Sequence, residues 1–204
     1  MTEVIKAEDP GSPERAAGVL GEGGVIVYPT ETLYGIGALV TSDAAVERIF
    51  EIKGRPKDMP IPVLVRDFEM LGSIAEAPPA AERLAGKFWP GALTIILKVS
   101  GELNPVITAG TGKVAVRISA HPFVRALFEY IDVPITSTSA NLSGAGNILK
   151  SSYVYETFRG KVELIIDSGN IPASKGSTIV DLAAGSPRIV REGDLSSREL
   201  KEYL

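Results

Sequence analysis

The chain's most informative stretch is Val25-Ile26-Val27-Tyr28-Pro29-Thr30-Glu31-Thr32-Leu33-Tyr34-Gly35-Ile36-Gly37, where an apolar run leads into hydroxyl groups, one carboxylate and glycines. The apolar residues Val25 to Tyr28 predict a buried strand. Pro29 marks the end of that strand, because proline has no backbone N–H to donate to a neighbouring strand. Gly35 and Gly37 allow either a close approach of the backbone or a positive φ.

The polar residues of this stretch follow the strand directly. Loops that leave the carboxyl ends of strands form the usual ligand crevice of an open α/β sheet. Thr30, Glu31 and Thr32 are therefore candidates for contacting a polar small molecule. The alternative is an ordinary turn, which clusters of Ser, Thr and Gly often form.

Apolar spacing predicts alternating helices and strands over the first two thirds of the chain and more closely spaced strands later. This pattern is typical of the α/β class, and we expect a single domain over residues 1–204, built on a twisted, mixed, open sheet with helices packed on it. The expected helices are Ser12–Leu20, Ser42–Lys53, Phe68–Ile74, Ala80–Phe88, His121–Tyr130, Ser151–Phe158 and Ser196–Leu204. The expected strands are Val25–Tyr28, Ile61–Arg66, Leu93–Val99, Val114–Ile118, Ile135–Thr138, Val162–Asp167, Ser177–Leu182 and Arg188–Arg191.

The composition is that of a compact globular protein. The 204 residues are 45% hydrophobic and 23% charged, which is enough apolar material for a large core. The formal net charge of -4 argues against a protein whose main task is to coat nucleic acid, because phosphate contacts need a positive surface. The chain has no apolar run of membrane-spanning length and no signal-peptide pattern at its start, so we expect a cytoplasmic location and no membrane contact.

The chain has no cysteine and only one histidine, which excludes several kinds of chemistry. Disulfides, thiolate nucleophiles and zinc–cysteine sites need cysteine, and a multi-histidine metal site needs more than His121, so we assign no metal ligands. His121 precedes Pro122, a pattern typical of the first turn of a helix, and we interpret it as structural. A chain this poor in nucleophiles and general acids is expected to work by positioning and electrostatics.

Two predicted strands carry polar side chains that need partners. In Lys113–Ser119, alternation places the aliphatic residues on one face, so Arg117 points to the other. In Ile135–Asn141, the same period places Ser137 and Ser139 on one side, and a hidden strand would not carry so many hydroxyl groups without partners. An exposed edge strand rich in threonine explains this second segment equally well.

The segment Lys53-Gly54-Arg55-Pro56-Lys57 places three cations within five residues at the expected end of a helix. Such a loop is suited to clamp phosphates, because Arg donates two parallel hydrogen bonds and Lys supplies a compact charge. Cations are also favourable at any helix C-terminus, which is the alternative interpretation. Gly110-Thr111-Gly112-Lys113 is not a P-loop and no Gly-x-Gly-x-x-Gly follows a strand, so an ATP site here must be assembled from separate loops.

Segments spread over nearly the whole chain match one known pattern in order: Tyr28–Gly35, Lys53–Pro56, Pro90–Thr94, Val114–Arg117 with His121–Pro122, Pro134–Gly144, Ser177–Leu182 and Arg191–Gly193. This set resembles the YrdC family of L-threonylcarbamoyladenylate synthases. The resemblance implies the YrdC-like fold, in its short, single-domain form.

The resemblance also implies a nucleotidyltransferase that makes threonylcarbamoyl-AMP and pyrophosphate from L-threonine, bicarbonate or CO2, and ATP. The product would serve the threonylcarbamoyl modification of tRNA through a downstream threonylcarbamoyl transferase complex. In this reaction a carbamate attacks the α-phosphorus while pyrophosphate leaves, so positioning and charge compensation are needed rather than a protein nucleophile. Mg²⁺ would arrive with the nucleotide, and no tightly bound cofactor is implied.

The same resemblance assigns roles to particular residues. Thr32, Arg117 and Ser137 would hold the threonine, with Arg117 paired to its carboxylate. Lys53 and Arg55 would be the catalytic cations. The residues implied for ATP binding are Lys53, Arg55, Lys113, Ser139, Asn141, Asn147 and Arg191.

The chain departs from the family pattern at two polar positions. Met59 and Leu64 stand where the family has an asparagine and a histidine, and residues 145–148 replace a Pro-Ser-Pro-Thr type of run. These changes would alter nucleotide affinity or mark a relative that uses another acceptor. Two other functions stay open. One is a double-stranded RNA or tRNA-binding module of the same fold, because the resemblance also implies a concave, positively charged surface, and the other is a carbamoyl-transfer enzyme that makes a different carbamoyl adenylate.

Overall fold

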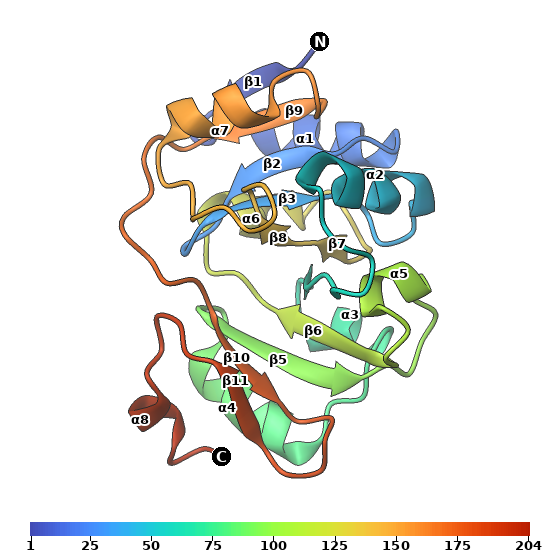
Figure 1. The fold of residues 1–204 in the computed structure, drawn as a ribbon, viewed down its shortest axis with the longest axis vertical. Coiled ribbons are helices and arrows are strands. Elements are labelled where there is room, and N and C mark those ends of the chain that lie inside the picture. Colours follow the sequence, from blue (N-terminus) through green and yellow to red (C-terminus); the bar gives the residue numbers. More distant parts are fainter.

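The computed structural model describes residues 1–204 and contains two β-sheets, one above the other in Figure 1. We call the upper one the first sheet and the lower one the second sheet. In spatial order, the first sheet consists of β1 (Glu3–Lys6), β9 (Leu164–Asp167), β2 (Ile26–Pro29), β3 (Tyr34–Gly37) and β8 (Thr138–Ser139). The second consists of β11 (Arg188–Arg191), β10 (Thr178–Asp181), β5 (Leu93–Lys98), β6 (Lys113–Arg117), β4 (Val63–Leu64) and β7 (Ile135–Thr136).

Both sheets are mixed. In the first, β2 pairs in parallel with β9 and antiparallel with β3. In the second, β5 pairs in parallel with β10 and antiparallel with β6. The expected mixed α/β class is thus confirmed, while the strands are divided between two sheets where the sequence pattern led us to expect one.

The segment of residues 135–139 belongs to both sheets. Its first half, β7, pairs antiparallel with β4 in the second sheet, and its second half, β8, pairs antiparallel with β3 in the first. Ser137 lies between the halves and donates its backbone N–H to the carbonyl of Pro62 at 2.7 Å. The single strand expected over Ile135–Thr138 is therefore two short edge strands, because the chain changes sheets at Ser137.

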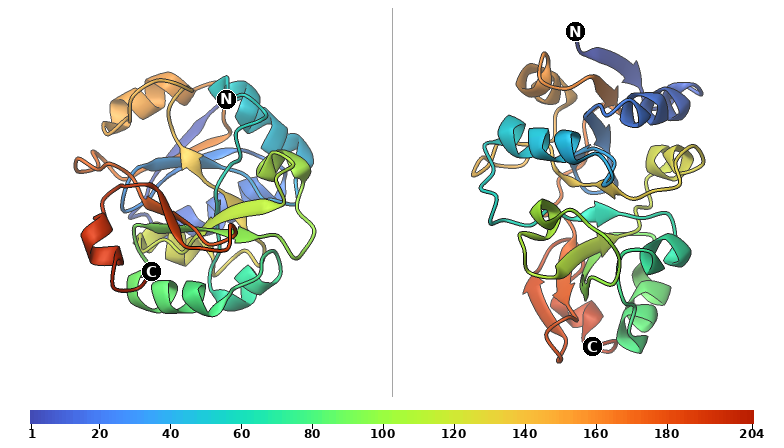
Figure 2. Two further views of the ribbon diagram at one scale, coloured as in Figure 1. Left: turned by 60° about the horizontal axis from the view of Figure 1, so that its bottom comes forward. Right: turned by 90° about the vertical axis from the view of Figure 1, so that its right-hand side faces the viewer.

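Helices surround both sheets, as the two views of Figure 2 show. Helices α1 (Ser12–Gly21) and α6 (Pro122–Leu127) pack against each other and against β2, while α4 (Pro79–Phe88) packs on β5 and α2 (Asp43–Lys53) on β3. No helix is both long and apolar enough to cross a membrane. The remaining helices are α3 (Phe68–Gly72), α5 (Pro105–Thr108), α7 (Ser151–Phe158) and α8 (Ser197–Leu200).

Strand β3 was not expected, because two of its four residues are glycine, which disfavours a strand interior. Neither glycine has a positive φ. A Cβ at Gly37 would overlap the carbonyl oxygen of Thr136, and one at Gly35 would lie 3.3 Å from the hydroxyl of Ser137. Glycine is thus required for the close approach of β3 to residues 136–137. Strand β1 and helix α5 were also missed, because four residues carry too little periodicity for a prediction.

One hydrophobic cluster of 48 buried residues includes side chains from both sheets. Helix α2 ends at Lys53 and is capped by Gly54, which has a φ of 59° in the left-handed conformation. The cap turns the chain sharply after Lys53. Residues 55–60 then form a loop that is exposed except for the half-buried Arg55.

Candidate functional site

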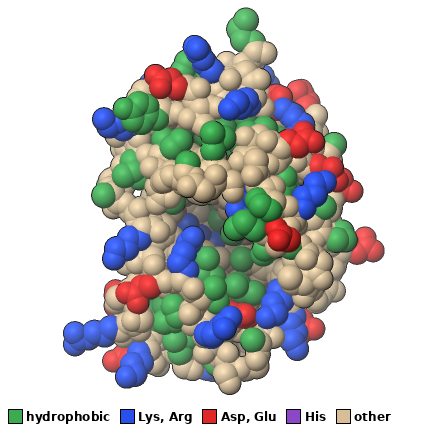
Figure 3. Space-filling model, viewed as in Figure 1, with side chains coloured by type: hydrophobic (Ala, Val, Ile, Leu, Met, Phe, Trp, Pro, Cys, Tyr) green, Lys and Arg blue, Asp and Glu red, His purple; other side chains and the backbone are tan.

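A cavity of about 500 Å³ lies between the two sheets and is lined by 25 residues. It opens as a hollow on the face shown in Figure 3, with Lys and Arg side chains at its rim. Its walls come from the β2–β3 turn, the loop after α2, one face of the second sheet, residues 137–139 and residues 175–177. The predicted site residues that line it are Thr32, Arg55, Arg117, Ser137, Ser139, Asn147 and Arg191, while Lys53, Lys113 and Asn141 do not.

Arg117 lies on the second sheet, on the face opposite the buried Val114 and Val116, as strand alternation predicts. It is only 7% exposed. Its Nε donates to the carbonyl of Gly91 at 2.9 Å, and its Nη1 donates to Thr32 Oγ1 at 2.9 Å. Its Nη2 forms an ion pair with Glu31 Oε1 at 2.6 Å. A buried, well-oriented guanidinium that lines a cavity is suited to bind a carboxylate or phosphate.

Glu31 fixes the position of Arg117 from the other side. Its carboxylate also accepts hydrogen bonds from Ser119 Oγ at 2.5 Å and from the Ala120 backbone N–H at 3.0 Å. Burial opposes ionisation of Glu31, but the charge of Arg117 and these hydrogen bonds outweigh it, so the pKa of Glu31 lies below its ordinary value. Glu31 does not line the cavity. It neutralises and orients the cation that does.

The β2–β3 turn is held by the hydroxyl of Thr30. Thr30 Oγ1 donates to the carbonyl of Leu33 at 2.6 Å and accepts from the Leu33 N–H at 3.1 Å. It also lies 3.1 Å from Thr32 Oγ1. Thr30 therefore closes the turn, and Thr32 carries the contact to Arg117. The stretch is both a tight turn and part of a polar cavity wall. The two interpretations of the sequence, an ordinary turn and a loop that contacts a ligand, are therefore compatible.

Ser137 and Ser139 both face the cavity from the segment that joins the sheets. Beneath Ser137 lies the fully buried Tyr28, whose hydroxyl donates to the carbonyl of Thr136 at 3.2 Å. Burial raises the pKa of Tyr28, so the phenol stays neutral. The side chain beneath Ser137 is thus neutral and hydrogen-bonded, and it adds no charge to this part of the cavity.

Lys53 lies behind the cavity wall and is 3% exposed. Its Nζ donates to the carbonyls of Ser139 and Asn141, the latter at 2.6 Å, and lies 3.3 Å from Asn141 Oδ1. An ammonium has three N–H donors, and all of them are used here. Burial and then the nearby charge of Arg55 lower the pKa of Lys53 to about 8. In this structure Lys53 therefore acts on the turn at residues 139–141 and not on the cavity directly.

Arg55 does line the cavity, on the loop that Gly54 redirects. Its Nε donates to the carbonyl of Met59 at 3.1 Å, and its Nη2 donates to that of Pro60 at 2.8 Å. Burial lowers the pKa of this guanidinium below its ordinary value. Arg55 lies on the loop after α2 and Arg117 lies on strand β6 of the second sheet, and both line the same cavity.

A second group of polar side chains lies across the second sheet. Arg191 donates from Nη2 to the carbonyl of Ser177 at 2.7 Å, and Ser177 Oγ lies 2.7 Å from Thr94 Oγ1. Burial and then the charge of Arg117 lower the pKa of Arg191. All three residues line the cavity, but only Arg191 was expected there from the sequence. Ser177 and Thr94 lay within the matched segments, which was the available signal.

The other predicted residues are placed as follows. Asn141 accepts from Ser139 Oγ at 2.6 Å and donates to the carbonyl of Ala145 at 2.7 Å, so it shapes the turn beside the cavity. Asn147 donates to the carbonyl of Ser174 at 3.4 Å and lines the cavity. Lys113 lies outside it, at the far end of β6 from Arg117, where it pairs with Asp181 at 3.2 Å.

Apolar side chains form the rest of the cavity surface. Leu64 is buried beside Arg117 in the parallel pairing of β4 with β6, and Met59 is 44% exposed on the loop of Arg55. Both of the positions at which the chain departs from the family pattern therefore face the cavity. The floor on the second sheet adds Ile96, Ala115, Ile179 and Val190.

His121 has the structural role expected from the sequence. It is the N-cap of α6, and its Nδ1 accepts a hydrogen bond from the Phe123 N–H at 3.2 Å. Burial lowers its pKa, although the charge of Glu31 acts in the opposite direction. Since Nδ1 accepts, the imidazole is neutral in this arrangement.

The site holds cations and hydroxyl groups but few carboxylates. The charged residues that line the cavity are Arg55, Asp58, Arg117, Lys175 and Arg191. No group of three or more His, Cys, Asp or Glu side chains is arranged to hold a metal ion. Chemically, the arrangement is suited to bind an anionic ligand with several charged groups, with one buried end at Arg117 and an open, cationic rim.

Comparison with known proteins identifies similar chains. The family model Sua5_yciO_yrdC, described as "Telomere recombination", matches residues 18–193. The threonylcarbamoyl-AMP synthase of Pyrococcus abyssi is 43% identical over 190 residues, which cover 93% of this chain and 56% of that protein. The threonylcarbamoyl-AMP synthase of Bacillus subtilis is 36% identical over 206 residues, which cover 100% of this chain and 59% of that protein.

A solved structure agrees with these matches. The crystal structure of P. abyssi Sua5 complexed with L-threonine has a TM-score of 0.93 and 39% sequence identity to this chain, over 100% of this chain and 61% of that one. The chain thus spans a little over half the length of these relatives.

Proposed function

The chain belongs to the Sua5/YciO/YrdC family, and from that premise we propose that it is a threonylcarbamoyl-AMP synthase. It would convert L-threonine, bicarbonate or CO2, and ATP into threonylcarbamoyl-AMP and pyrophosphate. One observation carries this proposal: Arg55 and the buried Arg117 line the same cavity. A cavity with a buried cation at one end and a cationic rim at the other fits an amino acid joined to a triphosphate.

The buried end of the cavity would take the amino acid. Arg117 would supply positive charge for the carboxylate, and Thr32 and Ser137 would offer hydroxyl groups for the remaining polar atoms. Leu64 is an apolar neighbour of Arg117 at this end. The complex of P. abyssi Sua5 with L-threonine supports threonine as the amino acid.

The open end would take the nucleotide. Arg55 and Arg191 supply positive charge, while Ser139 and Asn147 supply neutral polar groups. Lys53 and Asn141 would contribute by holding the turn that presents Ser139. Lys113 would reach the nucleotide only by exchanging its contact with Asp181.

The proposed reaction needs no protein nucleophile. The amine of threonine adds to CO2 and loses a proton, which gives a carbamate. An oxygen of this carbamate attacks the α-phosphorus of ATP, and the bond to the bridging oxygen of the β-phosphate breaks as pyrophosphate leaves. The side chains would orient the reactants in line and compensate the charge of the phosphates, with Arg55 as the proposed catalytic contact. Since the cavity offers a single carboxylate, Asp58, Mg²⁺ would be carried by the nucleotide's phosphates.

A pyrophosphate-release assay with purified protein tests the proposal. We expect release only when ATP, bicarbonate and L-threonine are all present, and omission of any one should abolish it. Substituting each of the other amino acids for threonine defines the acceptor, and carbamoyl phosphate serves as the substrate for a different carbamoyl adenylate. Turnover with carbamoyl phosphate and no dependence on threonine would contradict the proposal.

The proposal extends to the wider role of the chain. Residues 1–204 would act as one domain, which the shared hydrophobic cluster supports. The product would pass to a threonylcarbamoyl transferase complex for tRNA modification in the cytoplasm. The cationic rim would also meet a nucleic acid phosphate, so tRNA or double-stranded RNA is a proposed partner. RNA binding with steep salt dependence and no threonine-dependent turnover would favour an RNA-binding module instead.

A further inference from the structure

Lys175 lies on the connection that leads from the first sheet to the second, a segment visible at the left of Figure 1 between β9 and β10. The backbone here is held by Asp194. Its carboxylate accepts from the Lys175 N–H at 2.8 Å and from Ser174 Oγ at 2.6 Å, and the Asp194 N–H donates to the carbonyl of Gly176 at 2.8 Å. The base of the Lys175 side chain is therefore fixed beside the cavity.

The ammonium of Lys175 differs from the other cations of the cavity. Arg55 and Arg191 donate to backbone carbonyls, and Arg117 contacts Thr32 and Glu31. Lys175 Nζ forms no hydrogen bond or ion pair within the protein, although the residue lines the cavity and is exposed. All three of its donors are thus available to a ligand, and its flexible stem allows it to follow a group that changes position.

The depth of the residues indicates which part of a ligand Lys175 would meet. Thr32 and Arg117 are buried at the closed end, whereas Lys175 is exposed at the rim. In the proposed reaction the amino acid must lie against the α-phosphorus. If threonine occupies the closed end, the β- and γ-phosphates extend towards the rim.

We propose that Lys175 binds the terminal phosphates of ATP, the part that leaves as pyrophosphate. This inference rests on the proposed function and adds a contact that the sequence motifs did not indicate. The lysine neutralises charge as pyrophosphate forms and, because it is exposed and flexible, accompanies the pyrophosphate as it departs. The approach of a polyanion to this rim is favoured although the whole chain has a formal net charge of -4.

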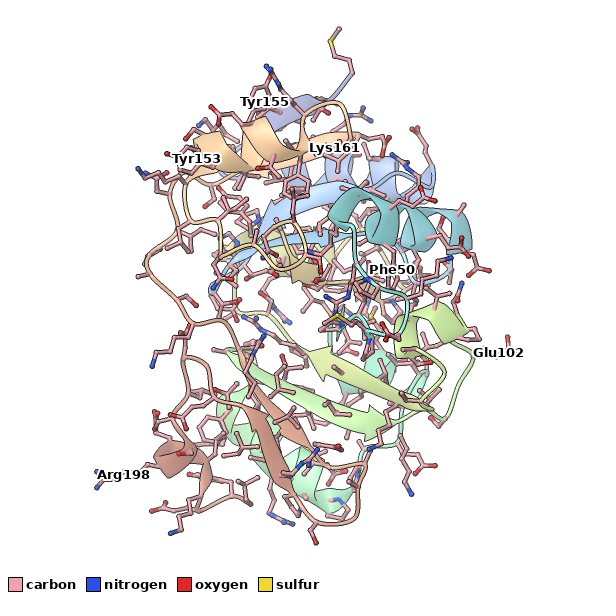
Figure 4. The ribbon with its side chains drawn as sticks, viewed as in Figure 1. Phe50, Glu102, Tyr153, Tyr155, Lys161 and Arg198 are labelled. Atoms are coloured by element: carbon pink, nitrogen blue, oxygen red, sulfur yellow. The ribbon has the colours of Figure 1, made fainter.

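Isothermal titration of ATP, pyrophosphate and AMP tests the inference. The proteins are wild type, Lys175→Ala, Lys175→Arg and the control Lys161→Ala, an exposed residue labelled in the upper part of Figure 4 that does not line the cavity. For Lys175→Ala we expect ATP and pyrophosphate to bind about five- to tenfold more weakly, with AMP changed less than about twofold, since charged hydrogen bonds at an exposed site are of moderate strength. Lys175→Arg should restore most of the loss, and Lys161→Ala should match wild type.

Two results would overturn the inference in distinguishable ways. If wild-type protein binds ATP and Lys175→Ala binds it equally well, or loses AMP affinity to the same extent, Lys175 does not contact the terminal phosphates and the proposed function stands. If wild-type protein binds neither ATP nor pyrophosphate, the proposed function and this inference fail together. Circular dichroism spectra of the four proteins establish that each is folded.

Discussion

Arg117 Nη1 donates a hydrogen bond of 2.9 Å to Thr32 Oγ1, and this bond joins the second sheet to the β2–β3 turn of the first. The two residues are far apart in the chain, and both are buried. The bond closes the inner end of the cavity. It also helps to orient the guanidinium, whose Nη2 pairs with Glu31 Oε1 at 2.6 Å.

The first prediction concerns this pair. Arg117→Ala should raise the threonine KM by at least tenfold, because a charged hydrogen bond contributes about 1.5–3 kcal/mol. Thr32→Val, which keeps the shape and removes the hydroxyl, should raise it by a smaller factor. Steady-state pyrophosphate release at saturating ATP measures both. An unchanged threonine KM in Arg117→Ala would rule out the carboxylate contact.

The second prediction concerns Glu31 and pH. The folded-state pKa of Glu31 lies below the ordinary carboxyl value of 4.5, so its stabilising contribution is present above that value and is lost as pH falls through the folded-state pKa. At neutral pH, Glu31→Gln should lower the free energy of unfolding by about 1–3 kcal/mol, because it leaves buried donors without a charged acceptor. Urea titrations should show this difference shrinking below pH 4.5. A difference that is constant across the acid range would contradict the assignment.

The third prediction separates Arg55 from its neighbour Lys57. Arg55→Ala should abolish adenylate formation while the protein stays folded, since the side chain bonds only to carbonyls of its own loop. Lys57→Ala is the matched control, because Lys57 forms only an exposed ion pair with Glu47 at 3.5 Å. Pyrophosphate release and thermal unfolding are measured for both variants. Normal turnover in Arg55→Ala would refute the catalytic role.

The fourth prediction concerns Lys53, whose pKa is about 8. Above this pH the ammonium loses its charge, the carbonyls of Ser139 and Asn141 lose a charged donor, and ATP affinity should decline. The effect of pH on stability has the opposite sign. Between about pH 8 and the ordinary lysine pKa of 10.5, Lys53 binds a proton more often in the unfolded chain than in the folded one. The contribution of Lys53 to the free energy of unfolding therefore rises with pH.

Lys53→Met tests both trends. The variant should bind ATP weakly at every pH between 7 and 9.5, and the alkaline decline seen in the wild type should be absent. Parallel titration and unfolding measurements across this range separate binding from stability. The same alkaline decline in variant and wild type would assign it to another group.

The fifth prediction concerns the close approach at Gly37. A Cβ there would overlap the carbonyl oxygen of Thr136, so Gly37→Ala should force β3 away from residues 136–137. We expect a loss of about 1–3 kcal/mol in stability, together with weaker ligand binding. Gly18→Ala, in α1 with open space around the glycine, should instead stabilise by about 0.5–1 kcal/mol. Equal melting temperatures for the two variants would disprove the close-packing argument.

The predicted elements with strong periodicity are present in the structure, as α2 and β5 illustrate. Strand β3 was missed because Gly35 and Gly37 give no strand signal, and only the pairing with β2 makes them a strand. The division of residues 135–139 between two sheets could not be predicted either. Local alternation gives the side-chain direction along a strand, but it does not say which strand lies alongside.

The site shows the same limits. Arg117 was placed on the correct face from alternation alone, and Thr32 from its position after a strand. Lys53 was expected beside the phosphates, and its burial behind residues 139–141 follows from contacts between distant segments. Lys175 lay in an ordinary loop with no motif, so nothing local distinguished it.

The order of residues alone determined the α/β class, the family resemblance and the types of side chain that the site would contain, because these depend on local periodicity and on motifs that can be read along the chain. Tertiary structure decided that the strands form two sheets, that Arg55 and Arg117 share one cavity, and that Lys175 faces it with its ammonium unpaired. The physical reason is that such relations depend on which distant segments pack together. That packing follows from burial and hydrogen bonding over the whole molecule and not from any single segment.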